Sequence, residues 1–121
     1  MIRPITINLE HDGPKVALQR MREEKVSVLL AVDKYRQYEG YITAEDALKL
    51  LHANDRDLRK ILRTDMPVVR PDTVLQEILS TISDSPTPVA VVLDGKLKGV
   101  LIRGVILESL ASSTNGGVEN D

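Results

Sequence analysis

The sequence contains no cysteine, tryptophan or phenylalanine, and only three tyrosines and two histidines among its 121 residues. The absence of cysteine excludes disulfides, thiolate metal sites and cysteine nucleophiles. Because aromatic rings are so scarce, the core must be almost wholly aliphatic. The histidines, His11 and His52, fall in a predicted loop and near a predicted helix end, where we expect surface residues.

The sequence also lacks an excess of one charge and any long apolar run. Sixteen basic and 18 acidic residues give a net charge of −2, which argues against a nucleic acid polymer as a partner. Apolar stretches such as residues 28–32 are far too short to span a bilayer, and residues 1–4 have no signal-peptide layout. We therefore expect a cytoplasmic protein.

Motifs for catalysis are missing as well. There is no phosphate-binding glycine loop of the Walker or dinucleotide type, and no serine or histidine in a nucleophile-elbow context. Nothing in the sequence predicts a metal site or a resident cofactor. We expect that this chain by itself is not an enzyme.

The chain repeats its own pattern with an offset of 61 residues. Met21 falls on Ile82 and Asp33 on Asp94, after which the second copy is two residues shorter and Gly40 meets Gly99. We predict one repeat over residues 2–53 and another over 64–112. A linker helix is expected over 54–63, and the polar tail over 113–121 is expected to be disordered.

Each repeat reads as strand, helix, strand, tight turn, strand and helix. In the first, we predict strands at 5–7, 26–32 and from 40, with helices at 13–25 and from 44; in the second, an extended segment at 66–70, a helix near 74–82, strands at 89–93 and from 99, and a helix from 103. Residues 28–32 do not alternate between apolar and polar, so both faces of their sheet should be covered. The fold class is therefore α/β, with two repeats packed sheet to sheet in pseudo-twofold symmetry.

One segment, residues 40–46, has a pattern that carries chemistry. It runs from a strand into a helix N-terminus, where backbone N–H groups favour an anion. Thr43 and Asp46 there could hold a ribose phosphate, with the carboxylate accepting from the ribose hydroxyls. An equally simple alternative, which these residues alone favour, is that Thr43 caps the helix and Asp46 completes a capping box.

The duplicated unit, with Gly-apolar-apolar-Thr-x-x-Asp at residues 40–46, resembles the CBS domain, and residues 4–112 resemble a tandem CBS pair, or Bateman module. Segments 12–18, 31–33, 86–92 and 98–104 are similar to the C-terminal CBS pair of the ATPase subunit of glycine betaine/proline-betaine ABC importers. The resemblance implies a regulatory fragment of a longer transport ATPase. Its expected partners are an upstream ATPase domain and membrane permease subunits, which would place it peripheral to the cell membrane.

The resemblance also implies a nucleotide ligand. Relatives that bind cyclic di-AMP hold it across a dimer of CBS pairs, with the bases against aliphatic strand residues and an arginine after the last strand. By position, the aliphatic residues are Ile5, Val26, Val28 and Val100, and the arginine is Arg103. We therefore expect a homodimer.

At most one nucleotide site of the AMP or ATP type is expected, at the motif of the first repeat. Ile102 and Val105 stand where Thr43 and Asp46 stand, and neither can hold a ribose. Three hypotheses stay open: a cyclic di-AMP sensor of an osmolyte importer, a structural or ionic-strength-responsive dimerisation module, and a single-site AMP or ATP sensor at Thr43 and Asp46.

Overall fold

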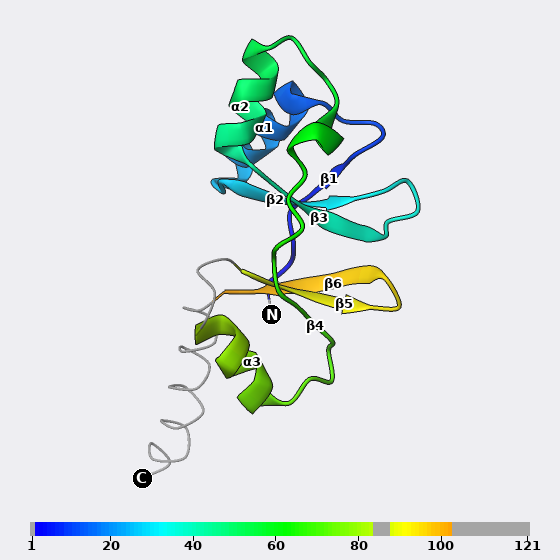
Figure 1. Ribbon diagram of the computed structural model, residues 1–121, viewed down its shortest axis with the longest axis vertical. Helices are drawn as coiled ribbons and strands as arrows, with labels where there is room; N and C mark the ends of the chain where they lie inside the picture. The colour runs from blue at the N-terminus through cyan, green and yellow to red at the C-terminus, as the bar shows by residue number, and fades with distance from the viewer. Residues whose placement is uncertain (1, 84–87, 103–121) are drawn as a thin grey trace.

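Two three-stranded sheets face each other at the centre of the computed structural model, and helices lie on their outer sides (Figure 1). The structure describes residues 2–83 and 88–102. Apolar side chains from both sheets form a shared core between them, which includes Leu30 and Tyr41 of the first sheet and Ala90 and Val100 of the second. This confirms the predicted α/β fold of two repeats packed sheet to sheet.

The first repeat contains β1 (Thr6–Asn8), α1 (Pro14–Glu24), β2 (Val28–Val32), β3 (Tyr38–Thr43) and α2 (Ala44–His52). Strand β2 is central, parallel to β1 and antiparallel to β3. The strand predicted from residue 26 begins two residues later, because Lys25 turns left-handed at a φ of 58° and the Val26 N–H donates to the Met21 carbonyl at 3.0 Å. Both residues thus close α1, in the manner of a helix C-cap.

The second repeat contains β4 (Val68–Val69), α3 (Leu75–Ser83), β5 (Val89–Leu93) and β6 (Lys96–Leu101), with the same strand order and directions. In the segment between the repeats, a 3-10 helix, η1 (Leu58–Ile61), replaces the longer helix predicted there. Its Leu58 is fully buried against the first repeat's core. The predicted helix from residue 103 and the tail at 113–121 lie outside the described residues.

Both faces of β2 are covered, as its unbroken apolar sequence predicts. Leu29 and Ala31 are fully buried in the core beneath α1 and α2, whereas Leu30 is buried against the second sheet. A two-residue alternation therefore persists, but each face meets a different apolar layer.

In the described part of the chain, three isolated backbone bridges, two between the repeats and one from the linker to β3, follow the pseudo-twofold symmetry. An antiparallel bridge joins Gln37 to Lys96, which are equivalent positions, so this contact lies on the pseudo-axis. The other two bridges are each other's equivalents. Ile2 exchanges hydrogen bonds with Val100 at 2.9 and 3.0 Å, and Arg63 exchanges two of 2.9 Å with Tyr41. Each segment that crosses between the sheets is thus bonded to an edge strand.

The strand register corrects the sequence offset by one residue in β2. The Leu30 N–H donates to the Ile5 carbonyl at 3.0 Å, and the Ala90 N–H donates to the Pro67 carbonyl at 2.9 Å. Leu30 therefore corresponds to Ala90, an offset of 60. No helix in the described part of the chain is long and apolar enough to cross a membrane.

Candidate functional site

A mostly apolar cavity of about 540 Å³ lies between the two repeats, and we call it the aliphatic cavity. It contains all four aliphatic residues singled out from the sequence, Ile5, Val26, Val28 and Val100. Among the residues that the structure describes, its lining is Ile2, Arg3, Ile5, Lys25, Val26, Ser27, Val28, Leu30, Pro88, Val100 and Ile102. Residues that are far apart in the sequence and belong to different repeats therefore share one surface.

Backbone pairing fixes the walls of the aliphatic cavity. Ile5 precedes β1 and accepts from the Leu30 N–H, while Val28 begins β2. Val100 lies in β6, paired with Ile2, and is only 8% exposed. Val26 follows the C-cap of α1 and is 36% exposed, so it remains accessible to solvent.

Polar groups in the lining of the aliphatic cavity are few and mainly cationic. Arg3 and Lys25 line it together with the hydroxyl of Ser27. An apolar cavity with a small number of polar groups is typical of small-molecule sites, and the two cations favour an anionic ligand. The sequence did not single out Arg3 or Lys25, because neither stands in a recognisable motif and only the fold brings them to the cavity. Arg103 lies outside the described residues; the residue before it, Ile102, lines the cavity.

The alternative site at Thr43 and Asp46 is engaged in contacts within the chain. The Asp46 N–H donates to Thr43 Oγ1 at 3.2 Å, so Thr43 caps α2. The Asp46 carboxylate accepts from Arg63 Nε at 2.9 Å. This hydrogen bond holds the pKa of Asp46 below its ordinary value. A ribose would have to compete with Arg63 for the carboxylate.

Tyr41 makes the two sides of the module unequal, because it stands at the position equivalent to Val100. It is buried in the core between the sheets, and its hydroxyl donates to Asp65 Oδ1 at 2.7 Å. Burial, followed by this hydrogen bond, raises the pKa of Tyr41. A buried ring with a bonded hydroxyl thus occupies the side that carries Thr43 and Asp46, whereas the smaller Val100 lines the aliphatic cavity.

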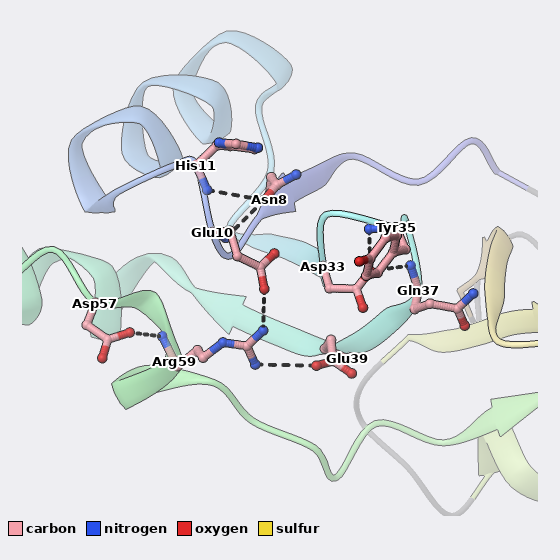
Figure 2. A network of polar contacts seen from close by, with 9 residues as sticks. All are labelled: Asn8, Glu10, His11, Asp33, Tyr35, Gln37, Glu39, Asp57 and Arg59. Carbon is pink, nitrogen blue, oxygen red and sulfur yellow. Dashed lines mark hydrogen bonds and ion pairs between the residues drawn. The ribbon is translucent and has the colours of Figure 1, made fainter.

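A polar network on the first repeat is structural (Figure 2). Arg59 of η1 donates to Glu10 at 2.8 Å and to Glu39 at 3.3 Å, which ties the linker to the β1–α1 loop and to β3. His11 enters this network through its backbone N–H, which donates to Asn8 Oδ1. His52 is the last residue of α2 and is exposed. Within residues 2–83 and 88–102, no group of three or more acidic or histidine side chains could hold a metal ion.

The family model described as "CBS domain" matches residues 1–53 and 57–112. The glycine betaine/carnitine transport ATP-binding protein GbuA of Listeria monocytogenes serotype 1/2a (strain 10403S) is 44% identical over 113 residues. That match covers 93% of this chain but 28% of the relative, so the chain spans just over a quarter of the length of that protein.

Solved structures share the fold. Staphylococcus aureus OpuCA superposes with a TM-score of 0.82 and 26% identity, covering 93% of this chain and 96% of that one. The structure of CbpB in complex with c-di-AMP has a TM-score of 0.75 at 18% identity, covering 100% of this chain and 83% of that one. The second likeness concerns the fold alone.

Proposed function

The chain belongs to the CBS domain family, and on that premise we propose that it is the regulatory module of the ATP-binding subunit of a glycine betaine importer, controlled by cyclic di-AMP bound in the aliphatic cavity. The longer subunit would be a transport ATPase with membrane permease partners. The module would lie in the cytoplasm, peripheral to the membrane.

The observation that carries the proposal is the convergence of Ile5, Val26, Val28 and Val100 on one cavity. Aliphatic walls suit the faces of adenine bases, and the flanking Arg3 and Lys25 suit phosphates. The 44% identity to GbuA supports the transporter assignment, and the c-di-AMP complex of CbpB shows that this fold type accommodates such a ligand in another protein.

A dimer of this chain would complete the site. Cyclic di-AMP is itself twofold symmetric, so two copies related by a twofold axis can each receive one base. Arg103 would supply a further cation from each copy. Binding would favour the arrangement of protomers that holds both bases, and so bias the attached ATPase domains. The ligand shifts this equilibrium only by its difference in affinity for the two arrangements.

The geometry favours this ligand over AMP or ATP at Thr43 and Asp46. The Asp46 carboxylate is bonded to Arg63, and the neighbouring Tyr41 fills its side of the sheet interface. No comparable contact occupies the aliphatic cavity in the described part of the chain. A ribose at an AMP site would therefore have to compete with Arg63 for the Asp46 carboxylate.

Calorimetric titration of the 121-residue chain with cyclic di-AMP tests the proposal. We expect saturable binding at one ligand per two chains, lost in Arg103→Ala and in Val26→Glu, which replaces an apolar contact of the base with a charged carboxylate. Val16→Glu is the matched control: Val16 is 38% exposed, against 36% for Val26, and lies on α1 outside the cavity. Absence of heat at high micromolar ligand, or equal losses in both glutamate variants, would refute the proposal. Salt-dependent dimerisation without ligand would then favour the dimerisation module.

A further inference from the structure

We propose that the module has a second ligand site, a cationic cavity that binds a phosphate-bearing anion of about diphosphate size. The cavity measures about 470 Å³ and is distinct in composition from the aliphatic cavity. Within residues 2–83 and 88–102, five cationic side chains line it, namely Arg3, Arg20, Arg36, Lys96 and Lys98, and Asp12 is the only carboxylate in the lining. We call it the cationic cavity.

The positive charge of the cationic cavity contrasts with the slightly negative net charge of the chain. The protein as a whole has a net charge of −2, yet five of its 16 basic residues meet here. Asp12 is already engaged: its Oδ2 accepts from the Asn8 N–H at 2.9 Å and lies 3.5 Å from Arg20 Nη1. Among the described residues, the other four cations have no carboxylate within ion-pairing distance. Their mutual repulsion in one cavity would be relieved by a multivalent anion.

The cations are delivered by separate elements of both repeats. Arg36 lies in the β2–β3 turn and Lys96 begins β6, and the bridge from Gln37 to Lys96 holds these hairpins together at the pseudo-axis. Figure 1 shows both hairpins extending to the same side of the molecule. Lys98 is the extra residue of a β-bulge, since Val91 pairs with Gly99 and Val92 with Leu97. Bulges commonly redirect a side chain in this way.

The equivalent bulge in the first repeat has a different role. Ala31 pairs with Gly40 and Val32 with Tyr38, which makes Glu39 the extra residue there. Glu39 accepts from Arg59 and so belongs to a structural ion pair, whereas its counterpart Lys98 faces the cationic cavity without one among the described residues. The two repeats therefore differ in charge at the same structural position, and at this position only the second repeat adds a cation to the cationic cavity.

Neutral donors complete the cationic cavity. Asn8 lines it, and its side-chain carbonyl accepts from the N–H groups of Glu10 and His11, which leaves its amide NH₂ as a donor. Thr6 adds a hydroxyl, while Arg20 is held in place by donating to the Thr6 carbonyl at 2.8 Å. The volume of the cavity, about 470 Å³, is many times the roughly 30 Å³ that one water molecule occupies in the liquid. The cavity therefore has room for more than one phosphate group.

Titration with sodium pyrophosphate in a phosphate-free buffer of low ionic strength tests this site. We expect saturable binding to the 121-residue chain, weakened at least tenfold in Lys96→Gln/Lys98→Gln. The matched control is Lys15→Gln/Lys49→Gln, which removes two exposed lysines from α1 and α2 and should stay within twofold of the unaltered chain. Equal weakening in both double variants would reduce the effect to net charge and overturn the proposal.

Two further arms locate the ligand. Arg3 lines both cavities, so the aliphatic cavity must be excluded as the source of binding. Lys25 lines only the aliphatic one of the two, and Lys25→Gln should leave the pyrophosphate affinity within twofold; a tenfold loss would refute the proposal. In amide NMR spectra, shift changes should centre on Thr6, Asn8, Lys96 and Lys98, and changes confined elsewhere would contradict it. Neither result depends on whether cyclic di-AMP binds.

Discussion

Arg63 donates from Nε to Oδ2 of Asp46 at 2.9 Å, and this ion pair joins the linker between the repeats to the first turn of α2. Arg63 is also hydrogen-bonded through its backbone to Tyr41, so the linker is attached both to α2 and to β3. The carboxylate that would bind a ribose thus holds the linker against the first repeat.

The first prediction concerns the pKa of Asp46. Arg63→Gln should raise it toward the ordinary aspartate value, because the hydrogen bond from Arg63 is the largest cause of its depression. A group with a depressed folded-state pKa stabilises the fold above its unfolded pKa and loses that effect as pH falls through the folded pKa. The variant should therefore lose stability at pH 7 but little at pH 2. NMR titration of the Asp46 carboxyl and urea unfolding at both pH values measure this.

Arg70→Gln serves as the control for that experiment. Arg70 pairs with Asp72 on the second repeat, where the ion pair is exposed and the Asp72 pKa is lowered by the same kind of hydrogen bond. The substitution should raise the pKa of Asp72 toward its ordinary value and leave the pKa of Asp46 unchanged. An Asp46 pKa that is the same with and without Arg63 would contradict the assignment.

The second prediction concerns the crossing of the linker over β3. Gly40 has a φ of +151°, and a Cβ built there would lie 2.3 Å from the carbonyl oxygen of Arg63. Gly40→Ala should therefore destabilise the fold by about 2 kcal/mol or more, since both backbone strain and a backbone clash oppose it. Gly13→Ala is the matched control, because its nearest neighbour is the flexible Arg56 side chain at 3.5 Å. Urea unfolding of both variants should show a clearly smaller loss for Gly13→Ala, and equal losses would contradict the prediction.

The fold could be predicted from the sequence because it depends on patterns that a sequence displays. The apolar run at residues 28–32 requires two covered faces, and the repeat supplies the second face. The sequence also predicted the Thr43 cap, as one of two interpretations. It did not predict the roles of Arg63 and Tyr41, because these depend on where the linker crosses the sheet edge, which only tertiary packing decides.

The candidate site was predictable in part for the same reason. Ile5, Val26, Val28 and Val100 were named through the family resemblance, and the fold brings them together. Whether they bind a ligand stays a prediction. The cationic cavity had no sequence signal, since Arg3, Arg36 and Lys98 are far apart in the sequence and meet only after both hairpins and a bulge have formed.

The third prediction concerns alkaline pH. Burial, with smaller contributions from Tyr41 and Asp65, raises the pKa of Tyr38 to about 12. A raised folded-state pKa for a tyrosine gives stability that is complete below the unfolded value of about 10 and is lost as pH rises through 12. Stability should therefore fall between pH 10 and 12, and Tyr38→Phe should flatten that decline. Urea unfolding at pH 9 and 11 measures the difference; an equally steep decline in the variant would show that another group is responsible.

The fourth prediction concerns the hydroxyl of Tyr41. Tyr41→Phe removes its hydrogen bond to Asp65 while keeping the ring in the core between the sheets. The loss should be about 1 kcal/mol, the ordinary net value of such a bond. Thermal unfolding with Tyr35→Phe as control measures it, because Tyr35 is 65% exposed and should tolerate the change. A loss that is no greater than the control would show that Asp65 does not hold the ring.

The last prediction uses the inequality of the two sides to test the proposed ligand site. Val100 and Tyr41 occupy equivalent positions in the two repeats. Val100→Tyr therefore introduces into the aliphatic cavity the same ring that Tyr41 places in the core on the other side of the module. If cyclic di-AMP binds against Val100, the added ring should weaken binding at least tenfold and abolish the rise in melting temperature that a ligand of the folded state produces. Val68→Tyr is the control, since Val68 is 51% exposed on β4 and outside the cavity. Because Val100 is nearly buried, melting without ligand must first show that the variant folds. A folded Val100→Tyr protein that binds as tightly as the unaltered chain would place the ligand elsewhere.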